Sequence, residues 1–362
     1  MASALGFIIN AAGLIVPLGL QAHYATQPTM EATSVQIIVG SGTKTAGGNV
    51  PHVALWDDDG QRIGQYHPSK KDKIGEGHVK TIVVPHRQNH NQQADPYYVM
   101  LSNLENDAIC IAAVTVANEK VSATFFGDTG YKCGQSWFLS QNKIGSDFQK
   151  PKCVWLDGDH TNGINARALS FHLNDMAPAP DKLAQYQSRP ETLCRSTPRF
   201  SFWGNLLPNG IVPFFRPRLQ YKDDASGSGE GADRDPARVV DRGDQYDKSV
   251  YLQQGEKKVR RRTAARRGAN HDPGHLIVTD HAGDDVRHVC EHPHSYGWDI
   301  VSTVQKLYCD MEHKRLYPVC DGGEHRDRCF DMKGKVVVPR AGIAGRDPVP
   351  RKRYTSEAHW EG

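Results

Sequence analysis

The sequence predicts a mainly β protein: an antiparallel β-sandwich followed by a disordered linker and a small cysteine-rich C-terminal segment. Short β-branched and aromatic runs recur between residues 33 and 175, turn residues separate them, and no apolar stripe has helical spacing. From residue 223 to 247 almost every side chain is polar or small, so burial cannot offset the entropy of ordering. Four of the eight cysteines then lie between residues 276 and 340.

Each strand of the sandwich is predicted from an apolar run of four to nine residues. The most apolar run, 108–116, is bounded on both sides by Asn with an acidic neighbour, which is typical of a buried strand. The acidic stretch 57–60 is a turn signal, and 86–96 is a polar surface loop. In chain order the predicted strands are 33–39, 53–56, 79–84, 97–101, 108–116, 122–126, 136–139, 153–156 and 168–173.

The domain boundaries are predicted from changes in composition. A breaker of alternating Ala and Pro follows the last strand, and residues 181–189 are expected to form a brief helix. The predicted parts are a signal peptide (1–22), the β-sandwich (33–175), a Pro/aromatic-rich extension packed on the sandwich (176–222), a disordered acidic-then-basic linker (223–275), a cysteine-rich segment (276–340) and a flexible tail (341–362).

The N-terminus carries an uncharged apolar run over residues 5–20, and small residues follow from Ala22. This pattern predicts a secretory signal peptide and therefore an extracellular protein. The alternative is a protein anchored in the membrane through the same run. Asn10, Pro17 and the short length of the run speak against a stable transmembrane span.

The eight cysteines fall into two groups of four on either side of the polar stretch, and none lies in a CxxC pair. An even number behind a signal-like start predicts four disulfides and an oxidising compartment. We expect each pair to stay within its group, while the connectivity inside a group stays open. The cysteines are Cys110, Cys133, Cys153, Cys194, Cys290, Cys309, Cys320 and Cys329.

The charge balance of 44 basic against 41 acidic residues does not favour nucleic acid or an anionic membrane as a partner. Locally, 257–267 holds seven basic residues in eleven, without the interleaved aromatic side chains that stack on single strands. A solvated run in the linker is the default interpretation. Dibasic processing at Arg261-Arg262 or at Lys352-Arg353 is the sharper hypothesis, and cleavage in the linker predicts two fragments that stay together only if a disulfide spans the cut.

Two acidic turns each follow an aromatic strand end and hold Asp57 and Asp59, and Asp157 and Asp159. Loop carboxylates supply the oxygen ligands that calcium needs, so these four residues are calcium candidates if the sandwich brings both turns to one edge. A plain turn is the commoner role of such residues. No other cofactor is predicted, because the C-terminal cysteines lie 19, 11 and 9 residues apart, which matches no zinc-finger spacing.

Several motifs carry a resemblance to known proteins. The segments 107–116, 127–137 and 151–159, together with Tyr308–Met311 and Cys329–Met332, resemble uncharacterised cysteine-rich secreted proteins of filamentous fungi. This likeness covers residues 35 to 332 apart from the disordered gap, and it implies secretion and disulfides but no activity. The strand order and the Asp-rich turn are also similar to PLAT-type β-sandwich domains.

The chain holds no Gly-x-Ser-x-Gly, no protease-like cysteine signature, no phosphate loop and no dinucleotide fingerprint. The first functional hypothesis is therefore a secreted, non-catalytic binding or structural protein. Its ligand, a glycan, a lipid surface or a protein, would contact the loops 57–60, 86–96 and 157–163. The alternative is a secreted hydrolase acting on an ester or a polysaccharide, which requires a concave pocket with converging titratable residues.

Overall fold

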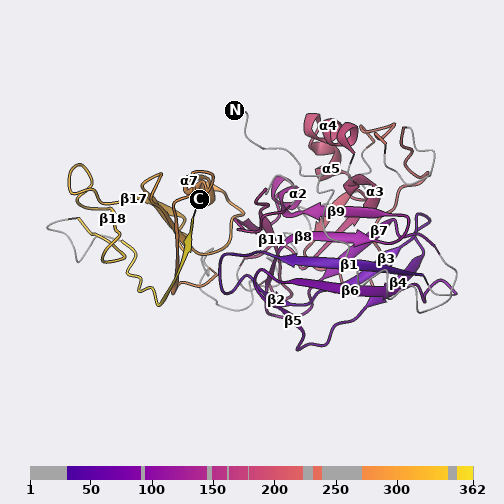
Figure 1. Ribbon diagram of the computed structural model, residues 1–362, viewed down its shortest axis with the longest axis horizontal. Helices are drawn as coiled ribbons and strands as arrows, with labels where there is room; N and C mark the ends of the chain where they lie inside the picture. The colour runs from indigo at the N-terminus through magenta and orange to yellow at the C-terminus, as the bar shows by residue number, and fades with distance from the viewer. Residues whose placement is uncertain are drawn as a thin grey trace.

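The computed structural model shows two β-rich parts side by side, a sandwich and a smaller C-terminal sheet (Figure 1). The prediction of a mainly β protein with an antiparallel sandwich is confirmed. The structure describes residues 31–90, 94–144, 149–160, 163–177, 179–222, 231–238, 271–340 and 349–361. The predicted signal peptide (1–22) lies outside these residues, as does most of the predicted linker.

The first sheet of the sandwich is built around β8, the strand predicted over 108–116. One edge of β8 pairs with β1, and the other edge pairs first with β11 and then with β9, all antiparallel. The sheet order is β10-β11-β8-β1-β6. Its strands are β1 (Ala32–Val39), β6 (Val79–Pro85), β8 (Ile109–Ala117), β9 (Ser122–Phe126), β10 (Trp137–Phe138) and β11 (Cys153–Leu156).

The second sheet packs on the first and has the order β13-β12-β7-β3-β4. Its strands show the alternation expected of a sheet covered on both sides. In β3, Val53 and Leu55 face the core shared with the first sheet, whereas Ala54 and Trp56 pack under Phe214 on the outer face. The strands are β3 (His52–Trp56), β4 (Arg62–Tyr66), β7 (Tyr98–Ser102), β12 (Ala168–His172) and β13 (Phe200–Trp203).

The segment predicted as an extension, 176–222, contributes more than a cover. Within this segment, strand β13 forms the edge of the second sheet and pairs antiparallel with β12. The helix predicted at 181–189 corresponds to α4. The short helices around the sandwich are α2 (Gly127–Lys132), α3 (Leu173–Met176), α4 (Pro180–Ser188) and α5 (Glu191–Arg195), and two short strands, β2 (Gly48–Asn49) and β5 (Lys73–Ile74), pair with each other.

The C-terminal part is a sheet of its own, with the order β17-β16-β15-β14-β20 and α7 packed on it. Strands β14 and β15 are parallel and are joined through α7, and β20 pairs parallel with the other edge of β14. Its elements are β14 (His275–Thr279), α7 (Val286–Glu291), β15 (Asp299–Ser302), β16 (Leu307–Asp310), β17 (Arg315–Pro318), β18 (Phe330–Asp331), β19 (Val336–Val337) and β20 (Ser356–Trp360).

Two predicted flexible segments differ from the structure where it describes them. Within the predicted tail 341–362, β20 completes the C-terminal sheet, so backbone pairing orders this end of the chain. Within the predicted linker 223–275, residues 231–238 lie against the sandwich, where Asp233 forms a bridge with Tyr221. Both segments are polar in sequence, and their order comes from partners distant in the chain.

The four predicted disulfides are present, and each pair stays within its group of four. No cysteine is free. Four disulfides indicate an oxidising compartment. None joins the sandwich to the C-terminal part. The pairs are Cys110–Cys153, Cys133–Cys194, Cys290–Cys309 and Cys320–Cys329.

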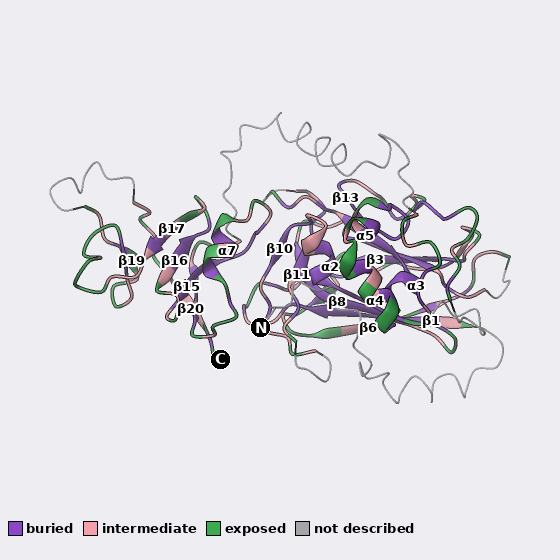
Figure 2. Ribbon diagram, turned by 90° about the horizontal axis from the view of Figure 1, so that it is seen from above, coloured by how far each residue is buried: buried purple, intermediate pink, exposed green. Residues whose placement is uncertain are grey.

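Indole N–H groups join the two parts instead. From the sandwich, Trp137 donates to Nδ1 of His292 over 2.9 Å, and Trp155 donates to the carbonyl of Tyr296 over 2.8 Å. Both tryptophans are fully buried, so these bonds satisfy donors that water cannot reach. Figure 2 shows buried residues in the strands of both parts.

Two tryptophans of the C-terminal part in turn donate indole hydrogen bonds to the sandwich. Trp298 donates to Oγ1 of Thr45 over 3.0 Å, and Trp360 donates to the carbonyl of Gly42 over 2.7 Å. Gly42 has φ +105°, and a Cβ at this position would lie 2.7 Å from the Trp360 indole nitrogen, so only glycine fits here. The four bonds and the continuous apolar core around them make the two parts one folded unit.

No described helix is long and apolar enough to cross a membrane.

The bond from Trp137 to His292 predicts a pH dependence of stability. It requires an unprotonated Nδ1, and burial, followed by the charges of His288, His294 and Lys314, lowers the pKa of His292 from 6.5 to about 4. The unfolded chain therefore binds a proton at higher pH than the folded chain. This contribution to stability is present above pH 6.5 and is lost as the pH falls toward 4.

Urea unfolding at a series of pH values measures this effect. We expect His292→Gln to flatten the fall in the free energy of unfolding between pH 6.5 and pH 4. His325→Gln is the matched control, because the described contacts of His325 are made by its backbone. Equal pH slopes in the two variants would contradict the assignment.

Candidate functional site: the His172 pocket

A cavity of about 570 Å³ lies at the end of the sandwich away from the C-terminal part. It forms where β3 and β12 end and β7 begins, because Tyr98 pairs with Trp56 on one side and with His172 on the other. We call it the His172 pocket. Its walls are Asp58, Tyr97, His172, Asn174, Arg234 and the segment 217–221.

The orientation of His172 is fixed from behind by Asp175, one turn further on in α3. Nδ1 of His172 lies 3.0 Å from Oδ2 of Asp175, and the hydroxyl of Tyr221 approaches the same nitrogen at 3.3 Å. The imidazole also lies against the ring of Tyr98, with centroids 4.6 Å apart. In the described part of the chain nothing bonds to Nε2, so this nitrogen is available to a molecule in the pocket.

Asp175 is fully buried and keeps its charge through its partners. Its Oδ1 accepts hydrogen bonds from Tyr186 at 2.5 Å, Arg199 at 2.8 Å and Tyr221 at 3.2 Å. Burial alone would raise the pKa of Asp175, but the charge of Arg199 and the contact with His172 outweigh it and hold the pKa below the ordinary range. An ionised Asp175 keeps the proton of His172 on Nδ1.

Arg199 links this arrangement to residues 231–238. Its guanidinium, fully buried, also pairs with Asp233 at 2.6 Å. Burying these charges is costly unless all of them are paired, so the segment around Asp233 is required for the network. Such a network has no sequence motif, because its members come from α3, from α4, from Arg199 just before β13 and from a polar stretch about thirty residues later.

The acidic turn after β3 forms the opposite wall. Burial raises the pKa of Asp58, while the nearby charges of His172 and Arg218 lower it. Arg218 pairs with Asp58 at 3.1 Å and with Asp59 at 2.5 Å. Asp57 points back into the turn, where its Oδ1 accepts the backbone N–H groups of Asp59 and Gln61. The pocket thus presents charges of both signs.

The two acidic turns do not meet. The turn 57–59 follows β3, beside Tyr98 at the start of β7. The turn 157–159 follows β11, whose last carbonyl accepts from Asn103, just past the other end of β7. The turns therefore lie at opposite ends of the sandwich and cannot share an ion. The predicted calcium ligands separated in this way are Asp57 and Asp59 on one side and Asp157 and Asp159 on the other.

The predicted ligand-binding loops also lie at opposite ends of the sandwich. Loop 57–60 lies at the end with the His172 pocket, and the described start of loop 86–96 is near it, because the N–H of Gln88 donates to the carbonyl of Ile63 in β4. Loop 157–163 lies at the opposite end. No sequence pattern pointed to the segment 217–221, which supplies half of the pocket lining.

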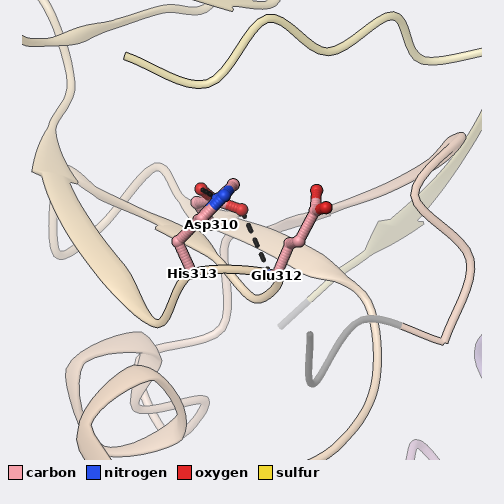
Figure 3. A group of neighbouring side chains, drawn as sticks. All are labelled: Asp310, Glu312 and His313. Atoms are coloured by element: carbon pink, nitrogen blue, oxygen red, sulfur yellow. Dashed lines mark hydrogen bonds and ion pairs between the residues drawn. The ribbon is translucent and has the colours of Figure 1, made fainter. Parts of the chain in front are cut away.

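A cluster of Asp310, Glu312 and His313 is the group among the described residues that could hold a metal ion, with ligand atoms within 4.8 Å of one another (Figure 3). Asp310 accepts from His313 Nδ1 at 2.7 Å and from the N–H of Glu312 at 3.1 Å. It is also paired with the ammonium of Lys352, which bonds to Asp299 as well. The lysine thus offsets one of the two charges of the buried carboxylates Asp299 and Asp310.

The same contacts correct one predicted processing site. The side chain of Lys352 is 8% exposed and is held between Asp299 and Asp310, so a protease cannot take it into its specificity pocket unless this region unfolds. Arg353 is exposed beside it. The other predicted processing site, Arg261-Arg262, lies outside the described residues.

No family model and no curated protein matches the chain.

The network behind His172 predicts a large effect of Asp175→Asn on stability. The substitution removes the charge that opposes Arg199 and leaves a buried cation with one partner fewer, so the free energy of unfolding should fall by roughly 3 kcal/mol or more. Asp58→Asn should cost less, because its partner Arg218 is about half exposed and solvent screens the pair. Urea unfolding at neutral pH measures both, and equal small losses would show that the network is not a structural constraint.

Proposed function

We propose that the chain is a secreted, non-catalytic protein that binds a sugar residue of a glycan in the His172 pocket. The predicted signal peptide and the four disulfides support an extracellular location. The observation that carries the proposal is the fixed imidazole of His172, whose Nε2 is left for a ligand while Asp175 holds the other nitrogen.

The chemistry of the walls supports a ligand rich in hydroxyl groups. Asn174, Gln220 and Arg234 offer donors, Asp58 offers acceptors, and Tyr97 offers the face of an aromatic ring. A sugar has hydroxyls that donate and accept together with apolar C–H faces. A pocket with both charge signs and an aromatic wall suits such a neutral polar ligand better than a strongly charged or purely apolar one.

A second candidate function, hydrolysis of a glycoside or an ester, rests on the same dyad. Nε2 of His172, with Asp175 behind it, could take a proton from water, and Asp58, with its raised tendency to hold a proton, could act as the acid. Against it, no described Ser, Thr or Cys side chain bonds to Nε2. A hydrolase of this kind would have to activate water directly.

Titration calorimetry with a panel of oligosaccharides tests the proposal on the disulfide-bonded chain. His172→Gln should weaken binding about tenfold or more, because a buried hydrogen bond to the ligand is lost. The control His325→Gln changes a half-buried histidine of the C-terminal part, far from the His172 pocket, and should leave the affinity unchanged. The affinity of Asp58→Asn measures what the opposite wall contributes to binding.

The two candidate functions separate in one further measurement. If the protein turns over chromogenic glycosides or esters and His172→Gln abolishes this turnover, the protein is a hydrolase and the binding proposal is wrong. Binding without turnover supports the proposal. Binding that His172→Gln leaves unchanged would show that the pocket is not the ligand site.

A further inference from the structure

A second cavity, of about 430 Å³, lies where the sandwich meets the C-terminal part. From the sandwich it is lined by Thr43, Lys44 and residues near Gln141, and from the C-terminal part by His275 and residues 357–361 of β20 and its end. We call it the junction cavity. It is separate from the His172 pocket, which lies at the other end of the sandwich.

Two buried polar atoms in its wall have no hydrogen-bond partner among the described residues. They are Oγ1 of Thr43, a residue 3% exposed, and Nε2 of His275, a residue 2% exposed. The other ring nitrogen of His275 is bonded to Oγ of Ser356 at 2.8 Å. A buried polar group without a partner costs about 1–3 kcal/mol, so two of them in one cavity indicate a missing ligand.

The cations at the cavity are also unpaired. Lys44, Lys143 and Lys150 line it, and none has a carboxylate partner in the part of the chain that the structure describes. Lys44 and Lys143 are exposed and Lys150 is half-buried, so their ammonium groups can reach a ligand at the mouth. All three come from the sandwich.

Three carboxylates also line the cavity. Glu76 accepts the backbone N–H of Gly42 at 2.7 Å, and Glu357 is paired with Lys335, which does not line the cavity. Glu361 is exposed close to the end of the chain. With Lys335 counted, four ammonium groups stand against the three carboxylates of Glu76, Glu357 and Glu361, so the net charge at the cavity is positive by one.

We propose that the junction cavity binds an oxyanion, the phosphate or sulfate group of a small molecule or of a sugar. The hydroxyl of Thr43 and a ring N–H of His275 would donate to the oxygens, and the three lysines would supply the opposing charge. Since the donors come from both parts of the molecule, the ligand stabilises their contact as well as the fold.

Titration calorimetry with inorganic phosphate and with inorganic sulfate tests the site on the intact chain. Thr43→Val should lower the affinity about tenfold, because a hydrogen bond to a charged group is lost. It should leave the ligand-free free energy of unfolding unchanged or raised, because the hydroxyl has no partner there. Lys44→Gln combined with Lys150→Gln should lower the affinity roughly tenfold in total, and Lys71→Gln, an exposed lysine outside the cavity, is the control.

A second titration, with a sulfated polysaccharide, distinguishes a glycan-borne oxyanion from a free ion or a small molecule. Tighter binding of the polysaccharide than of sulfate, with the same loss on Thr43→Val, assigns the group to a glycan, and equal affinities assign the free ion or a small molecule. The melting temperature should rise with ligand concentration as mass action requires. Absence of binding, or binding that Thr43→Val and the lysine pair leave unchanged, would overturn the proposal.

Discussion

The structure depends on the reciprocal indole bonds between the sandwich and the C-terminal sheet. Trp137 and Trp155 donate in one direction, and Trp298 and Trp360 in the other. Each indole has a single donor, and burial makes an unmade bond expensive, so the four together fix the distance and the rotation of the two sheets. No disulfide joins the two parts, so hydrogen bonds and packing hold them together, which the prediction of a spanning disulfide as the sole link did not consider.

This constraint gives the sandwich a docked end and a free end. The docked end of the sandwich is covered, and the junction cavity is formed there by residues that the docking brings together. The free end carries the His172 pocket, where the buried ion pairs of Asp175 and Arg199 hold the walls. Disulfides stiffen each part on its own, so the loops that line both cavities are carried on a rigid scaffold.

Local patterns predicted the sandwich well because alternation and turn residues are local signals. The run predicted over 108–116 is β8, one residue off at each end. The edge strands β13 and β20 were missed because a short stretch without clear alternation becomes a strand only beside its partner, and both partners lie far away in sequence. The His172 pocket was missed for the same reason: its walls come from 58, 97, 172–174, 217–221 and 234, and only the fold places Asp175 behind His172.

The measurement that tests the account most directly is the behaviour of a chain cut between its two parts. A specific protease site is inserted between residues 238 and 271, the oxidised protein is cleaved, and the products are separated by size exclusion at neutral pH without denaturant. Because four indole bonds and a shared core hold the parts, the fragments should elute together and separate in concentrated urea without reductant. Separation under native conditions would contradict the claim that the two sheets form one folded unit.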